Sequence, residues 1–143
     1  KAFGLAGLRI GTIAGSPEAL EPIRFAIPVY SVNIAAVVAV QAALDDLPYM
    51  HRYLAEVAQS KRLLYAACDR LGLRYTRSEA NFVLVNVGTR AHELVAGALA
   101  RGVYLRDRST EPGCEGCVRI AAGVVEHTRR CIAVMEEVLC AVR

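Results

Sequence analysis

The sequence lacks the features that mark chains built to bind nucleic acid or to cross a membrane. It has no run of like charge and no alternation of basic with aromatic residues, although 17 basic residues exceed 14 acidic ones. Such runs form the electrostatic surface that nucleic acid requires, so we expect no nucleic-acid partner. Every apolar stretch is interrupted by a charge, proline or glycine before it reaches the roughly 20 residues that a spanning helix needs. We therefore expect no membrane span.

The cysteine pattern lacks the features of a disulfide framework and of a metal site. The five cysteines are odd in number, and most lie in apolar segments where a small thiol can be buried. A reducing cytoplasm is the simplest interpretation. Cys114 and Cys117 have the spacing of half a zinc site, but no second pair of ligands lies at comparable spacing. Because a structural zinc needs four ligands, we expect no metal.

The chain also lacks an initiating methionine, and it shows no internal repeat and no low-complexity segment. It opens on Lys1, from which we expect a part of a longer protein rather than a complete one. What is present is apolar: 55% of the 143 residues are hydrophobic, enough to bury a sizeable core. The chain is therefore expected to be globular.

The first third of the sequence predicts a short strand followed by two helices. Residues 8–13 form the strand, and Ser16 caps the first helix with Pro17 at its first position. The segment 32–44 is almost entirely alanine, valine, isoleucine and leucine, which predicts a helix buried nearly all round.

The rest of the chain alternates helical and strand patterns. An amphipathic helix starts near Asp46 and ends at Gly72, with an apolar face facing inward. That face comprises Tyr53, Leu54, Val57, Leu63, Leu64 and Ala67. Strands are predicted at 73–76, 81–87, 103–106 and 117–121, and helices at 90–101 and 125–142. The fold class is α/β, with residues 1–45 and 46–143 in separate domains.

The segment from Lys1 to Gly11 carries the first candidate chemistry. It reads Lys-Ala-Phe-Gly-Leu-Ala-Gly-Leu-Arg-Ile-Gly, with a lysine and an arginine around a glycine-containing turn. Only a primary amine can form an imine with an aldehyde cofactor, and the planar donors of an arginine suit a phosphate. Glycine-rich turns beside basic residues are common, however. The alternative that Lys1 is a solvated terminus and Arg9 a surface charge therefore remains open.

Two arginines in apolar strands are the second candidate. Arg119 lies in the middle of Cys117–Ala121, and Arg106 ends another apolar segment. A buried arginine is costly unless an anion pairs with it. Two such side chains are suited to hold a doubly anionic substrate, and the alternative is that each pairs with an internal Asp or Glu.

These segments resemble the histidinol-phosphate aminotransferase family, whose members are fold-type I pyridoxal-phosphate enzymes. The pattern Lys-x-x-x-x-x-Gly-x-Arg-x-Gly is similar to the family's cofactor-lysine segment, and Ser78–Val85 is similar to its Ser-x-Ala-Asn-Phe strand. The resemblance covers essentially the whole chain. It implies the end of the large cofactor-binding domain at 1–45, followed by the small C-terminal α/β domain at 46–143.

The resemblance also implies roles for four residues. Lys1 would bond covalently to pyridoxal 5'-phosphate and carry a proton, and Arg9 would hold the cofactor phosphate. Arg119 would bind the substrate carboxylate, and Arg106 would help bind a substrate phosphate. The implied reaction transfers an amino group from a phosphorylated donor, histidinol phosphate, to 2-oxoglutarate, and the implied assembly is a cytoplasmic homodimer.

The sequence departs from the family pattern in two respects. Thr12 stands where the family often has an aromatic residue, and the other cofactor-site residues of the family lie upstream of the position that matches Lys1. Threonine-phosphate decarboxylases and aromatic-amino-acid aminotransferases share much of the pattern, so the reaction type is better specified than the substrate. A non-catalytic α/β module is the remaining alternative.

Overall fold

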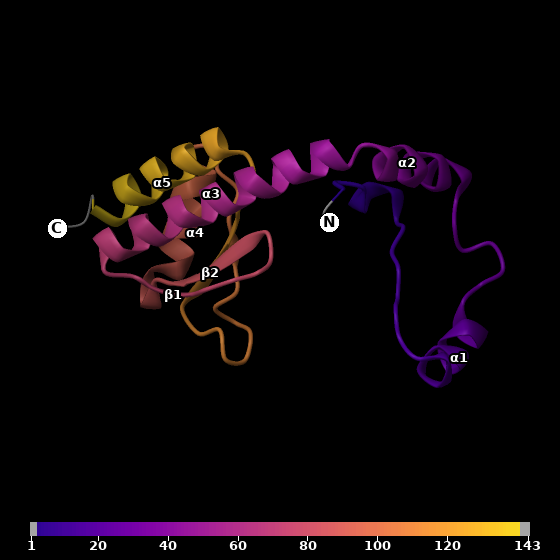
Figure 1. Cartoon of the computed structure of the whole chain (residues 1–143). Helices are drawn as coiled ribbons and strands as arrows, with labels where there is room; N and C mark the ends of the chain where they lie inside the picture. Colours follow the sequence, from indigo (N-terminus) through magenta and orange to yellow (C-terminus); the bar gives the residue numbers. More distant parts are fainter. Residues whose placement is uncertain (1–2, 141–143) are drawn as a thin grey trace. The chain divides into compact units, whose positions relative to one another are not determined.

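The structure, a computed structural model, describes residues 3–140. The chain divides into two compact units, Lys1–Arg52 and Tyr53–Arg143. Figure 1 shows the helices and strands of both. The division falls inside one long helix, α3 (Leu47–Leu71), which begins in the first unit and ends in the second.

The first unit contains a short 3-10 helix, η1 (Ala6–Leu8), and the helices α1 (Pro17–Ala26) and α2 (Ile34–Asp45). The predicted start of α1 is confirmed: the Ser16 hydroxyl accepts a hydrogen bond from the backbone N–H of Ala19 at 3.4 Å, and a proline occupies the first turn. These contacts satisfy a backbone donor that would otherwise lack a partner at the helix start. Local capping chemistry therefore fixes where α1 begins.

Two predictions for the first unit are wrong. Residues 8–13 form no strand, because a strand needs a neighbour for its backbone hydrogen bonds and no described segment pairs with them. The apolar helix α2 is not buried all round, since within it only Ala36 is buried and Val38 is 64% exposed. Two helices and one turn supply too little chain to cover an apolar helix on every side.

The second unit is a four-stranded antiparallel sheet with helices. Its strands are β1 (Arg74–Thr76), β2 (Phe82–Asn86), β3 (Arg106–Asp107) and β4 (Cys117–Ala121), and they lie in the order β1-β2-β4-β3. A 3-10 turn, η2 (Gly88–Arg90), leads into α4 (Ala91–Leu99), and α5 (Val125–Cys140) follows β4. The predicted bounds of β4 are confirmed.

The strand register sorts side chains onto two faces of this sheet. Leu84 of β2 is the register partner of Arg119, which is also the register partner of Arg106. Because successive side chains of a strand alternate between faces, these three lie on one face, which we call the open face. Of its members only Cys117 is buried, with 8% of its surface exposed. The open face consists of Arg74, Thr76, Phe82, Leu84, Asn86, Arg106, Cys117, Arg119 and Ala121.

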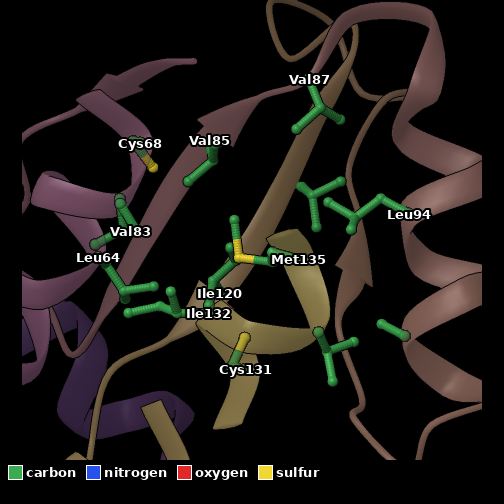
Figure 2. Close-up of a cluster of buried hydrophobic side chains, with 14 of the residues drawn as sticks. Leu64, Cys68, Val83, Val85, Val87, Leu94, Ile120, Cys131, Ile132 and Met135 are labelled. Carbon is green, nitrogen blue, oxygen red and sulfur yellow. The ribbon is translucent and has the colours of Figure 1, made fainter. Parts of the chain in front are cut away.

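The opposite face packs against the helices and forms the core (Figure 2). Val83 and Val85 of β2 and Ile120 of β4 are almost completely buried there, as the two-residue alternation requires. Leu64 of α3, Leu94 of α4 and Met135 of α5 meet them from the helices. Each such side chain contributes about 1.5–3 kcal/mol by leaving water. The core thus holds one face of the sheet and leaves the other free.

Most of the helix and strand predictions for this unit are confirmed, with two exceptions. Gly72, at a φ of 67°, ends α3 as predicted, because glycine adopts the left-handed conformation without strain. Leu54 was expected to point inward but is 44% exposed. Residues 103–105 are not part of a strand, and only Arg106 and Asp107 pair with β4. No helix within residues 3–140 is long and apolar enough to cross a membrane.

Candidate functional site

The candidate residues fall in both units. Lys1, predicted to carry the cofactor, lies outside the described residues. Arg9 belongs to the first unit, whereas Arg106 and Arg119 belong to the second. The two groups are therefore described separately.

Arg9 closes the tight turn that follows η1. Its backbone N–H donates to the carbonyl of Ala6 at 3.2 Å, and that of Leu8 donates to Leu5 at 3.0 Å. Arg9 adopts a φ of 57°, the only positive φ of a non-glycine residue among residues 3–140. Such a conformation is uncommon for a branched or long side chain and is often found at functional positions. The side chain is exposed and forms no ion pair with the described carboxylates.

Asn33 ties this turn to α2. Its side-chain Nδ2 donates to the carbonyl of Leu8 at 3.0 Å, while its Oδ1 accepts from the backbone N–H of Ala36 at 2.8 Å. One side chain therefore caps a helix and braces the turn that presents Arg9. Asn33 was not among the predicted residues, although an asparagine directly before an apolar run is a known helix-start signal.

The tertiary structure brings Arg106 and Arg119 together. They are register partners on the neighbouring antiparallel strands β3 and β4, so their Cβ atoms are about 4.5–5.5 Å apart on the open face. Like charges placed directly opposite destabilise a sheet. Neither guanidinium pairs with a carboxylate within the described part of the chain, so the internal ion pairs of the alternative interpretation are not present among residues 3–140.

Asp107, the carboxylate nearest to Arg106 in sequence, is directed to the other face of β3. It accepts hydrogen bonds from the backbone N–H of Ser109 at 2.8 Å and from its hydroxyl at 2.5 Å. These hydrogen bonds hold the pKa of Asp107 below its ordinary value. Its charge is therefore satisfied locally and does not neutralise the arginine pair.

The arrangement suits an anion of more than one charge. Two neighbouring arginines, of which Arg106 is exposed and Arg119 is half-buried, carry planar sets of N–H donors on the open face. Ile120 and Val118 on the far side of β4 are fully or almost fully buried, so the strand that carries Arg119 is fixed by the core. Arg119 therefore projects from a rigid strand beside Arg106, an arrangement whose chemistry suits a carboxylate or a phosphate.

Phe82 is a neighbour of Arg119 that the sequence did not predict. The guanidinium carbon of Arg119 lies 5.3 Å from the centroid of the Phe82 ring, in cation–π geometry. Phe82 was noted only as part of the strand motif. The contact depends on the pairing of β2 with β4, which a single sequence does not display.

The sequence pattern of the family described as aminotransferase class I and II matches residues 1–133 of the chain. The chain therefore belongs to this family. It is similar, at 40% identity over 97% of its length, to a histidinol-phosphate aminotransferase of Symbiobacterium thermophilum. A histidinol-phosphate aminotransferase of Methanopyrus kandleri is 35% identical over the same share of the chain. The chain spans 38% and 37% of the length of these two relatives.

A solved structure agrees with these sequence relationships. The histidinol-phosphate aminotransferase of Sinorhizobium meliloti, determined in complex with pyridoxal-5'-phosphate, superposes with a TM-score of 0.86 at 26% identity. The alignment covers 100% of this chain and 40% of that one. The predicted fold class, a C-terminal portion of a fold-type I aminotransferase, is confirmed.

Proposed function

We propose that the protein carrying this chain is a pyridoxal-phosphate-dependent aminotransferase that converts histidinol phosphate with 2-oxoglutarate as amino acceptor. The observation that carries the proposal is the 40% identity to a histidinol-phosphate aminotransferase over 97% of the chain. The paired, unneutralised Arg106 and Arg119 support it independently, because both substrates are anions. The reaction belongs to histidine biosynthesis.

The residues of the chain fit the cofactor. Arg9 presents an exposed guanidinium on a closed turn, a donor set that suits a phosphate ester. The chain contains two lysines, Lys1 and Lys61, and the ammonium group of Lys61 donates to the carbonyl of Ser78 at 2.6 Å. Lys61 therefore has a structural contact, and Lys1, which matches the lysine of the family pattern, is the amine that we propose for covalent attachment.

The role that we propose for each residue follows from the chemistry of its side chain. When bound, the cofactor supplies an aldehyde that receives the substrate amine and a ring that stabilises negative charge on the α-carbon. The amine of Lys1 moves the proton to and from that carbon. Arg9 holds the cofactor phosphate. Arg119 binds the α-carboxylate of the oxoacid, and Arg106 binds the phosphate of the amino donor.

The Lys1→Ala variant of the whole protein tests this assignment. We expect loss of the visible absorbance of the bound cofactor and a fall in turnover of at least about 10²- to 10⁴-fold, the usual contribution of a proton-transferring group. Lys61→Ala is the matched control and should retain both properties. Retention of absorbance and turnover in Lys1→Ala would remove Lys1 from the mechanism.

Comparison of amino donors separates this reaction from those of aromatic-amino-acid aminotransferases and threonine-phosphate decarboxylases. Histidinol phosphate should be used far better than phenylalanine, and no carbon dioxide should be released from threonine phosphate. Strong activity with phenylalanine alone, or decarboxylation, would contradict the proposed substrate.

We also propose the wider setting that the family resemblance implies. Residues 1–45 would complete a large cofactor-binding domain, and residues 46–143 would form the small domain. The enzyme would act as a homodimer in the cytoplasm, where the five cysteines stay reduced.

A further inference from the structure

Phe82 and Arg119 are diagonal neighbours on the open face. The register of β2 with β4 pairs Phe82 with Ala121 and Leu84 with Arg119, so all of them lie on one face. The Arg119 guanidinium carbon lies 5.3 Å from the centroid of the Phe82 ring. This distance is within the roughly 6 Å at which a ring face attracts a cation.

The ring constrains the arginine without using its hydrogen-bond donors. A carboxylate partner would accept the N–H groups of the guanidinium and cancel its charge. An aromatic face attracts the same charge through its quadrupole and leaves the in-plane donors free. An arginine held by a ring therefore keeps its full capacity to bind an anion.

The neighbouring charge makes this restraint necessary. Arg106 stands directly opposite Arg119, and no carboxylate among residues 3–140 pairs with either of them. Repulsion between the two guanidinium groups favours their separation when no anion is bound. The Phe82 ring supplies an attraction on the side of Arg119 that faces away from Arg106, since β2 and β3 flank β4 on opposite sides.

We propose that Phe82 is a positioning residue, whose ring holds the Arg119 guanidinium ready to bind the substrate carboxylate. The inference rests on the proposed function for the identity of that anion. The contact between Arg119 and the Phe82 ring does not depend on the proposed function.

The test compares Phe82→Leu with Phe82→Tyr in the whole cofactor-loaded protein. Leucine is apolar but has no ring, and tyrosine keeps the ring. Phe82→Leu should raise KM for 2-oxoglutarate about 2- to 30-fold, the range that corresponds to a cation–π contact, with kcat within about twofold. Phe82→Tyr should stay within about twofold of the wild type. Leu84→Val, which trims the direct partner of Arg119 without touching a ring, is the matched control and should also stay near the wild type.

Two readouts do not require turnover. The Nε–Hε proton of Arg119, identified by its loss in Arg119→Lys, should show a ring-current shift that disappears in Phe82→Leu and persists in Phe82→Tyr. The Kd of inorganic phosphate and of 2-oxoglutarate, measured by calorimetry, should rise in Phe82→Leu by the same factor as KM. In an Arg119→Ala background, Phe82→Leu should change either Kd by less than about twofold.

The outcomes separate the two proposals. If the wild type does not transaminate but Phe82→Leu weakens anion binding, the positioning role stands and the proposed reaction fails. If the wild type transaminates and Phe82→Leu matches Leu84→Val, the positioning role is overturned. An effect of Phe82→Leu that persists in Arg119→Ala, or an unshifted Arg119 proton, overturns it as well.

Discussion

Single arginines in this chain have different partners. Arg70, Arg90, Arg101 and Arg108 each form an ion pair with a glutamate. Arg90 also donates to the carbonyls of Val138 and Leu139 near the end of α5, where helix carbonyls lack intrahelical partners. Arg106 and Arg119 form no such pair within residues 3–140. Their free donors are what an anion site requires.

Replacing Arg106 tests its assignment to the substrate phosphate. Arg106→Ala should raise KM for histidinol phosphate about 10- to 150-fold, because a hydrogen bond to a charged group is worth about 1.5–3 kcal/mol. KM for a donor without a phosphate should change little. Arg74→Ala, which removes another exposed guanidinium from the same face, with β2 and β4 lying between β1 and β3, is the control. Equal effects of both variants would contradict a specific phosphate contact.

The buried cysteines predict how thiol labelling and the free energy of unfolding depend on pH. Burial raises the pKa of the Cys68 thiol and of the Cys131 thiol to about 11 each, from 9.0. At neutral pH a thiol reagent should therefore label exposed Cys140 first, and label Cys68 and Cys131 only after unfolding.

The sign of the linked stability change follows from the same shift. The folded state holds the two thiol protons more tightly, so this contribution is fully present below pH 9.0 and is lost as pH rises toward about 11. Denaturant titrations between pH 8 and pH 11 should show a decreasing free energy of unfolding, and Cys68→Ala should show a smaller decrease. Rapid labelling of Cys68 in the folded protein would contradict the prediction.

At the level of elements, the start of β4 depends on a close approach between two glycines. A Cβ added to Gly116 would lie 2.7 Å from the Cα of Gly88 and 2.8 Å from its carbonyl oxygen. The backbone N–H of Val87 donates to the carbonyl of Gly116 at 2.8 Å, which fixes this approach. Because the contact is with backbone, a side-chain rotation cannot relieve it.

Two glycine variants separate the contact from the backbone conformation. Gly113 and Gly116 both have positive φ values, 76° and 73°, but nothing lies within 4 Å of a Cβ at Gly113. Gly113→Ala should lower the free energy of unfolding by about 1–2 kcal/mol, because alanine is strained in the left-handed conformation. Gly116→Ala should lower it by roughly 1–3 kcal/mol more, the penalty of overpacking. Urea unfolding curves with an unchanged m-value would measure both free energies, and equal decreases in the two variants would contradict the close approach.

At the scale of the whole molecule, the two units differ in how much apolar surface they expose. In the first unit Phe25, Val29 and Tyr30 are 85%, 90% and 96% exposed, whereas the second unit has a continuous core. Contiguous exposed apolar surface marks a contact with other protein or a risk of aggregation. The first unit therefore requires more protein than the described residues provide.

This difference predicts how pieces of the protein behave. The chain 1–143 by itself should self-associate in size-exclusion chromatography, bind a hydrophobic dye strongly and show negligible transamination. Residues 47–143, which keep α3 complete, should elute as a monomer, bind little dye and unfold cooperatively. A monomeric, dye-free or catalytically active 1–143 chain would contradict this prediction.

The sequence by itself determined most of the helices and strands of the second unit and pointed to the family. The start of α1 and the end of α3 follow from Ser16 and Gly72, because caps and left-handed glycines act within a few residues of their position. The segment around Lys1 and Arg9 suggested a cofactor lysine only through its resemblance to a family.

The tertiary structure alone decided what lies beside Arg119. The pairing of Arg119 with Arg106, and its contact with the Phe82 ring, depend on strand register. Register is set by how the core side chains of the sheet fit the helices and by the turns between strands. Those interactions connect residues far apart in the chain. Local sequence patterns therefore identify the arginines, and packing determines that they lie side by side.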